Sequence, residues 1–228
     1  MRQLIYDVGM HNGDDSAYYL AKGYEVVGID ANPNLCAACT IRFEREIAEG
    51  RMTVLNTGVG PAEDRMIFHI NERESQLSSF VAPVDSKDSW LRIRVPVRRL
   101  SAIIAEHGPA HYIKIDVEHF DHLILAELEQ GGLRPSFISA EAHHPQTLAA
   151  LLKLGYRRFK LVEGVKVPIL YGQRSIATLS GGIVDHSFPA LSSGPFGDDL
   201  DGPWLDAQAL SREIASVGWG WIDIHAAA

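Results

Sequence analysis

The sequence has little cysteine, no long hydrophobic run and less positive than negative charge. Its 228 residues include two cysteines, too few for a scaffold held by disulfides. No apolar stretch reaches the roughly 18 residues of a membrane span, and Met-Arg-Gln-Leu leads into a strand-like segment rather than a signal peptide. Since 21 Lys and Arg face 29 Asp and Glu, the formal charge is −8, which disfavours a nucleic-acid partner. We expect a cytoplasmic enzyme or binding domain, with no membrane partner.

Short apolar runs alternate with helix-period stretches as far as about Gly164, which is typical of βαβ units around a mostly parallel sheet. This alternation predicts strands at 4–8, 25–30, 52–59, 66–70, 93–97, 112–117, 137–141 and 158–162. The predicted helices lie at 16–22, 35–48, 101–107, 120–129 and 146–154, and a helix at 205–216 precedes a final strand at 219–225.

The composition predicts one domain over residues 1–228, with two parts. Residues 1–172 form a cofactor-binding core, in which a polar, Ser-rich loop at 71–90 lies over the sheet. Residues 173–228 form a turn-rich tail, whose Gly/Pro-rich stretch 194–203 is expected to act as a lid before the final helix and strand. A homo-oligomer is compatible with this organisation.

The turn after the first predicted strand carries Asp7, Gly9 and Gly13 in a D-x-G-x-x-x-G pattern. The two glycines permit a positive φ and close approach of a ligand to the backbone. Asp14 and Asp15 follow at the helix start, where they can cap free N–H groups and would repel a pyrophosphate. A cofactor with a ribose but no phosphate therefore fits better than NAD, FAD or a nucleoside triphosphate.

Asp30 ends the second predicted strand, where a carboxylate can accept hydrogen bonds from two ribose hydroxyls. With the first turn, it points to S-adenosylmethionine, although turn-fixing and helix-capping roles are the structural alternative for Asp7 and Asp30. The predicted cofactor contacts are Asp7, Gly9, His11, Asn12, Gly13, Asp30, Ala31, Asn56 and Asp116.

Residues 112–121 read Tyr-Ile-Lys-Ile-Asp-Val-Glu-His-Phe-Asp. They resemble the I-K-I-D-V-E-G-x-E signature of FkbM-family S-adenosylmethionine-dependent methyltransferases, and residues 7–13 resemble that family's D-V-G-x-N-x-G motif. Similarities at 56–60, 78–80, 193–199 and 221–225 extend over nearly the whole chain. His119 replaces the family's glycine, Asp121 replaces its glutamate, and His11-Asn12 displaces the asparagine of the first motif.

This resemblance implies an α/β, Rossmann-like class I methyltransferase fold, with a mostly parallel sheet, helices on both faces and an antiparallel final strand. It also implies an S-adenosylmethionine-dependent O-methyltransferase that acts on a small-molecule hydroxyl, of a sugar or a secondary metabolite. N-methylation, another use of the same cofactor, and a catalytically silent cofactor-binding module are the alternatives. His119 and Asp121 leave the cofactor assignment intact but put the substrate in question.

Acidic and imidazole groups follow two of the predicted strands at the edge where ligands bind in open α/β sheets. Asp116 is expected beside the reacting centre, and Glu118 is either a supporting acid or a residue that ties down the loop. Glu141 and His143 alternate onto one face as an acid–imidazole pair near the acceptor. We therefore expect catalysis from Asp116, Glu118 and His143, and acceptor contacts from Glu141, His143 and Ser79, the last of these in the serine-rich loop.

Two further groupings have weaker functional interpretations. Asp116, Glu141 and His143 could hold Mg²⁺, Mn²⁺ or Zn²⁺, but their spacing matches no firm metal motif, so no metal is predicted. Cys36 and Cys39 match C-x-x-C without a second pair, and packing inside a helix is favoured over redox or zinc chemistry.

Overall fold

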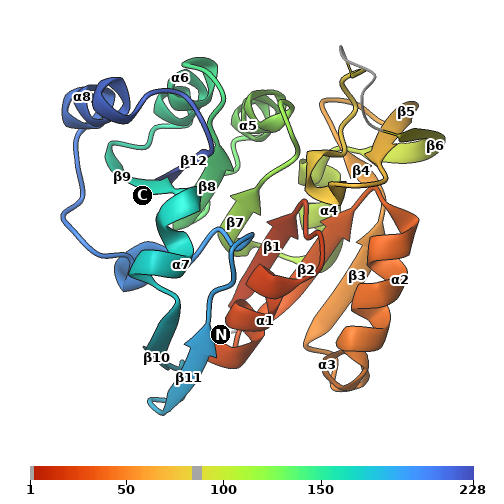
Figure 1. The fold of residues 1–228 in the computed structure, drawn as a ribbon, viewed down its shortest axis with the longest axis horizontal. Helices are drawn as coiled ribbons and strands as arrows, with labels where there is room; N and C mark the ends of the chain where they lie inside the picture. The colour runs from red at the N-terminus through yellow and green to blue at the C-terminus, as the bar shows by residue number, and fades with distance from the viewer. Residues whose placement is uncertain (1–2, 84–88) are drawn as a thin grey trace.

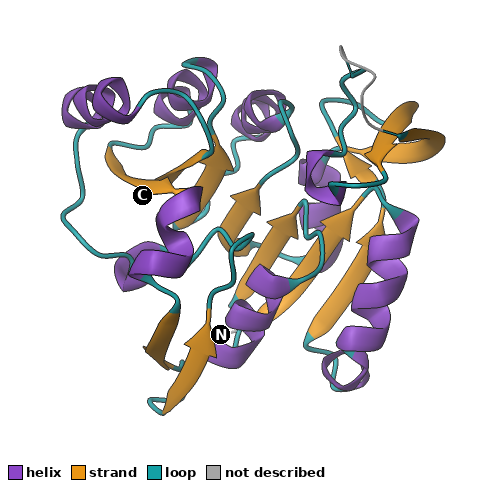
Figure 2. Cartoon of the chain, viewed as in Figure 1, coloured by secondary structure: helices purple, strands orange, loops and turns teal. Residues whose placement is uncertain are grey.

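A seven-stranded, mostly parallel sheet forms the centre of the protein (Figures 1 and 2). The computed structural model describes residues 3–83 and 89–228. The strand order is β3 (Met52–Asn56), β2 (Glu25–Asp30), β1 (Leu4–Val8), β7 (Ala110–Ile115), β8 (Phe137–Glu141), β12 (Ile222–Ala227) and β9 (Arg158–Glu163). Of these strands, β12 runs antiparallel to both its neighbours, β8 and β9, whereas the other neighbouring pairs are parallel. This arrangement confirms the predicted fold class.

Helices cover both faces of the sheet because alternate strand residues point to opposite sides. In β1, Leu4, Tyr6 and Val8 join one apolar cluster, while Ile5 joins the other. The first cluster includes residues of α4 (Leu100–His107), α5 (Asp121–Gln130), α6 (Gln146–Lys153) and α8 (Ala207–Val217). The second includes residues of α1 (Asp14–Lys22), α2 (Pro33–Arg42), α3 (Glu44–Ala48) and α7 (Val167–Leu170). Figure 1 shows α1 and α2 in front of the sheet.

A smaller sheet lies beside the carboxyl ends of β2 and β3 (Figure 1). It contains β4 (Gly58–Val59), β5 (Asp64–Asn71) and β6 (Trp90–Arg98), with β6 between the other two. The strand predicted at 52–59 is thus divided, since β3 belongs to the main sheet and β4 to the smaller one. A short 3₁₀ helix, η1 (Ser75–Leu77), lies in the expected polar loop, of which residues 84–88 fall outside the described residues.

The tail contains more regular structure than expected. Strands β10 (Gln173–Ala177) and β11 (Ile183–Ser187) form an antiparallel hairpin that the sequence analysis missed. The stretch 194–203 lines no part of the main cavity, and its role as a lid stays a prediction. Its Phe196 stacks on Tyr112 with ring centroids 4.1 Å apart, and Ser192 donates a hydrogen bond of 2.6 Å to Asp15 on α1. These contacts make the start of this stretch part of the core.

Every helix within residues 3–83 and 89–228 is too short or too polar to cross a bilayer.

Candidate active site

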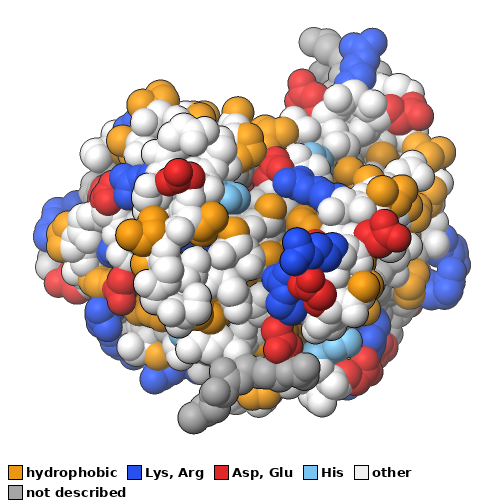
Figure 3. Space-filling model, turned by 90° about the horizontal axis from the view of Figure 1, so that it is seen from below, with side chains coloured by type: hydrophobic (Ala, Val, Ile, Leu, Met, Phe, Trp, Pro, Cys, Tyr) orange, Lys and Arg blue, Asp and Glu red, His pale blue; other side chains and the backbone are white. Residues whose placement is uncertain are grey.

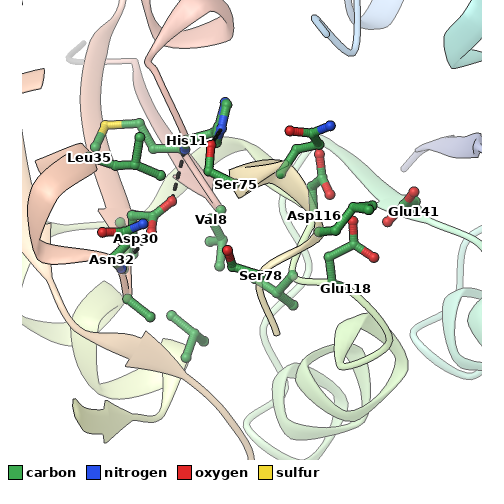
Figure 4. A pocket seen from close by; sticks show the side chains of 18 of the residues that line it. Val8, His11, Asp30, Asn32, Leu35, Ser75, Ser78, Asp116, Glu118 and Glu141 are labelled. Atoms are coloured by element: carbon green, nitrogen blue, oxygen red, sulfur yellow. Dashed lines mark hydrogen bonds between the residues drawn. The ribbon is translucent and has the colours of Figure 1, made fainter. Parts of the chain in front are cut away.

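A cavity of about 370 Å³ opens at the carboxyl ends of β1, β2, β7 and β8, and the loop around η1 forms one of its walls. Its size is within the range of small-molecule sites. Figure 4 shows two groups of side chains across it: Asp30 and Asn32 lie on one side, and Asp116, Glu118 and Glu141 gather on the other. We call these the nucleoside end and the acceptor end.

Gly9 joins the two ends because it packs directly on the loop after β7. Its φ is +82°, and a Cβ built there would lie 1.7 Å from the carbonyl oxygen of Asp116. On its other side, the N–H of Gly9 donates a hydrogen bond of 2.9 Å to the carbonyl of Ile29. Both the conformation and the space therefore require glycine at this position.

The start of α1 differs from the expected arrangement. Gly13 is the N-cap residue and receives no side-chain cap, so Asp14 and Asp15 lie in the first turn rather than at the cap. The side chain of Asn12 accepts a hydrogen bond of 3.1 Å from the N–H of Asp14. Gly13 does not line the cavity; a Cβ there would meet the ring of Phe43 at 2.5 Å. In the described structure Gly13 therefore has a packing role, and its cofactor contact stays a prediction.

Asp7, a predicted cofactor contact, lies behind the cavity wall rather than in it. It is fully buried and accepts a hydrogen bond of 2.6 Å from the Ser16 hydroxyl. The ammonium of Lys114 lies 3.6 Å from Asp7, 3.2 Å from Asp15 and 3.3 Å from Asp116. Burial raises the pKa of Asp7, while the charge of Lys114 opposes that rise. Asp7 therefore anchors Lys114, which does line the cavity.

The three carboxylates around Lys114 also determine its charge. Burial alone would lower the pKa of Lys114, but Asp116, Asp7 and Asp15 together raise it well above its ordinary value. Lys114 is thus an ammonium whose single charge is shared among three acids, and it fixes the position of Asp116.

At the nucleoside end, Asp30 is held by the backbone. Its Oδ2 accepts a hydrogen bond of 2.9 Å from the N–H of His11, drawn in Figure 4, and its Oδ1 accepts one of 2.7 Å from the N–H of Asn32. Burial raises the pKa of Asp30 to about 6, although these two hydrogen bonds oppose the rise. Each carboxylate oxygen keeps acceptor capacity, so the geometry fits two ribose hydroxyls.

The remaining wall of the nucleoside end is mostly apolar. Ala31 lines it as predicted, together with Ile29, Leu35, Val59, Phe68 and Phe80. Asn56 does not line it; its side-chain amide donates a hydrogen bond of 3.1 Å to the carbonyl of Asp30. The sequence analysis missed Phe68, because nothing in the sequence shows that β5 lies against the cavity. The tail also contributes Leu191 and Trp221 to the cavity wall.

At the acceptor end, the chain leaves β7 before Asp116, so Asp116 and Glu118 do not share a strand face. Glu118 and His119 both adopt a left-handed backbone, with φ of 49° and 75°. The hydroxyl of Ser79 donates a hydrogen bond of 2.9 Å to the carbonyl of Glu118. Ser79, a predicted acceptor contact, does not line the cavity, and its hydrogen bond supports this strained turn.

The side chains of Glu118, Glu141 and His143 converge on one point. The Nε2 of His143 lies 2.9 Å from Oε2 of Glu141 and 3.6 Å from Oε2 of Glu118. The carboxylates of Glu118 and Glu141 raise the pKa of His143 to about 10, so the imidazole is charged at neutral pH. Burial raises the pKa of Glu141 to about 7. In this arrangement His143 is a cation, and its predicted catalytic role stays a prediction.

The remaining sequence candidates do not line the cavity. Cys36 and Cys39 are buried free thiols, and burial raises the pKa of Cys36 to about 12 and that of Cys39 to about 11. Both therefore remain protonated at neutral pH, in agreement with packing. Asp121, the departure from the family glutamate, is buried at the start of α5 and does not line the cavity.

The sheet order, the antiparallel β12 and the site at the carboxyl ends of the strands define a Rossmann-like, class I methyltransferase. The model of the FkbM methyltransferase domain matches residues 7–160. The chain therefore belongs to the FkbM family of S-adenosylmethionine-dependent methyltransferases.

Several solved structures are similar to this chain. A methyltransferase FkbM from Methylobacillus flagellatus is 18% identical with a TM-score of 0.50, and the match covers 70% of this chain but 40% of that one. A precorrin-6Y C5,15-methyltransferase from Geobacter metallireducens is 10% identical, with a TM-score of 0.43 and coverage of 99% and 79%. An S-adenosylmethionine-dependent O-methyltransferase from Thermotoga maritima is 10% identical, with a TM-score of 0.45 and coverage of 99% and 58%. No curated protein matches the sequence significantly.

Proposed function

We propose that the protein transfers a methyl group from S-adenosylmethionine to a hydroxyl oxygen of a small molecule. The observation that carries this proposal is one cavity with a ribose-accepting carboxylate at one end and a cluster of proton-accepting groups at the other. The family membership supplies the cofactor class, and the cavity supports the choice of acceptor.

The nucleoside end fits the cofactor in polarity and in shape. Asp30 accepts the ribose hydroxyls, the backbone of His11 and Asn32 holds its carboxylate in place, and Ile29, Leu35 and Phe80 offer apolar surface to a flat base. Asp116 places negative charge between the two ends, which suits a positively charged sulfur. We propose Gly9, His11, Asn12, Asp30, Ala31 and Asp116 as the cofactor-binding residues.

The bound cofactor supplies a methyl group on a sulfonium: as the new C–O bond forms, the C–S bond breaks, its electron pair stays on sulfur, and the acceptor hydroxyl loses its proton. In this protein Glu118 takes that proton, because its carboxylate faces the cavity beside Asp116. His143 and Glu141 hold the acceptor by hydrogen bonding, and Lys114 keeps Asp116 in position.

The charge of the protein favours a small acceptor over a nucleic acid. On the face shown in Figure 3, acidic and basic side chains are intermixed instead of forming a continuous basic stripe. The formal charge of −8 points the same way.

Calorimetric titration with S-adenosylhomocysteine tests the cofactor assignment. Asp30→Ala should weaken binding about 100-fold, since two hydrogen bonds to a charged group are lost. Asp64→Asn, at an exposed carboxylate of β5, is the matched control and should bind normally. Equal binding by the wild type and Asp30→Ala would contradict the proposal that Asp30 binds the ribose.

Radioactive methyl transfer to a panel of sugars, phenolic hydroxyl compounds and amines then tests the acceptor class. Labelled hydroxyl compounds support the proposal. Labelling of amines alone would replace it with N-methylation, and tight S-adenosylhomocysteine binding without any product would favour a silent binding module.

A further inference from the structure

The acceptor end has more negative charge than its neighbours neutralise. Asp116, Glu118 and Glu141 each offer a carboxylate oxygen, and these oxygens all lie within 4.8 Å of one another. Lys114 contributes one positive charge, but Asp7 and Asp15 share it. Within the described residues, the Nε2 of His143 lies against Glu118 and Glu141. A further positive charge would stabilise this cluster.

Glu141 provides an independent sign of a ligand. It is 5% exposed, and its Oε2 accepts no hydrogen bond from any residue that the structure describes. The Nε2 of His143 is 2.9 Å away, yet it too makes no aligned hydrogen bond within the same residues. A buried carboxylate oxygen normally has a donor, so this atom is prepared for a partner that is not a protein group.

The spacing of these two atoms fits a shared metal ion. Two atoms bound side by side to one octahedral ion at about 2.1 Å lie about 3 Å apart, and they face the ion rather than each other. The Oε2 of Glu141 and the Nε2 of His143, at 2.9 Å, have this spacing. Glu118 and Asp116 bring further oxygens within 4.8 Å of the Glu141 oxygen.

We propose that Asp116, Glu118, Glu141 and His143 bind one divalent cation of the Mg²⁺ or Mn²⁺ type at the acceptor end of the cavity, and that the ion replaces the proton on Nε2 of His143. Three carboxylates with one imidazole suit these ions better than a thiolate-preferring metal. Four protein ligands leave about two of six octahedral positions for water or for acceptor oxygens.

The cation deepens the proposed function, on which its catalytic role rests. It would bind the acceptor hydroxyl oxygen and make its proton more acidic, which is a Lewis-acid role. Only one oxygen of Glu118 is needed as a ligand, so the other takes the proton. The electron pair released on the acceptor oxygen forms the C–O bond, and the charge of the cation does not change.

Titration of the full, EDTA-treated chain with Mn²⁺, followed by the paramagnetic resonance signal of free Mn²⁺, tests the site directly. We expect one ion per chain, with and without S-adenosylhomocysteine. Glu141→Gln and His143→Ala should each weaken Mn²⁺ binding at least tenfold. Glu163→Gln, at a carboxylate paired with Lys166, and His144→Ala, whose ring packs on His122, are the matched controls and should stay within twofold.

The outcomes separate this inference from the proposed function. S-adenosylhomocysteine binding, measured on the same variants, shows that they are folded. If the wild type fails to bind S-adenosylhomocysteine, the methyltransferase proposal is defeated, while the result of the Mn²⁺ titration remains valid. The metal site is overturned if no saturable Mn²⁺ binding is seen. It is equally overturned if several ions bind with affinities that none of the ligand variants changes.

Discussion

The two ends of the cavity are built in different ways. At the nucleoside end, the backbone N–H groups of His11 and Asn32 hold Asp30, and the turn between β1 and α1 fixes their positions. At the acceptor end, the side chains of Glu141 and His143 face each other without an aligned hydrogen bond. The comparison teaches that the backbone of the fold fixes the geometry of the nucleoside end, whereas side chains determine the geometry of the acceptor end.

Gly9→Ala should have the largest effect, because it breaks the contact that joins the two ends. The new Cβ would overlap the Asp116 carbonyl at 1.7 Å in a backbone with φ of +82°. We expect a loss of at least about 3 kcal/mol in the free energy of unfolding, measured in urea. Gly50→Ala, with φ of +70° and no atom within 4 Å, should lose only about 1 kcal/mol. Equal losses would show that the close contact is unimportant.

Glu118→Gln should impair catalysis at the acceptor end without affecting binding at the nucleoside end. Losing the proton acceptor should lower kcat about 100-fold, while S-adenosylhomocysteine binding stays within twofold. Glu72→Gln, an exposed glutamate bonded to Ser89, is the control and should leave both unchanged. An unchanged kcat would assign Glu118 to the loop alone.

The pH dependence of cofactor binding should report the nucleoside end. Burial raises the pKa of Asp30 to about 6, and only its ionised form accepts hydrogen bonds at both oxygens. Affinity for S-adenosylhomocysteine should therefore fall as the pH drops through 6, reaching about a tenfold loss at pH 5 relative to pH 8. Calorimetry on Asp30→Asn should show a flat profile; a step of the same size there would assign the titration to another group.

The smallest effect should come from the link between the first turn and η1. Ser75 Oγ lies 2.8 Å from Nε2 of His11, a hydrogen bond worth about 1 kcal/mol. Ser75→Ala should weaken S-adenosylhomocysteine binding about threefold, as measured by calorimetry, and Ser89→Ala should not. A loss tenfold larger would mean that η1 closes the nucleoside end.

Much of the fold and one edge of the site could be predicted from the sequence. Apolar periodicity located every strand of the main sheet, and parallel strands bring their carboxyl ends, with Asp30 and Asp116, to one edge. The same reasoning could not show that Asp7 bonds to Ser16 of α1, because a position near a strand end does not determine whether a side chain faces the cavity or a neighbouring helix.

Other errors have local physical causes. Asn56 and Ser79 are near the site but bond to backbone carbonyls, a choice that residue type does not determine. The β10–β11 hairpin was missed because it is a two-stranded ribbon with little buried surface; Ile183, for example, is exposed. The charge on His143 depends on Glu118, in the loop after β7, and on Glu141, at the end of β8, which only the tertiary structure brings together.

The place of β12 has a consequence for the order of assembly during synthesis. Because β12 lies between β8 and β9, β9 has no partner in the main sheet until residues 222–227 have been made. The strands that carry Gly9, Asp30 and Asp116 pair with one another without β12, so they can associate earlier. Until β12 has been made, the outer edge of β8 remains open and able to pair with another chain. In a nascent chain, the nucleoside end can therefore form before β12 covers the exposed edge of the sheet, which could otherwise aggregate.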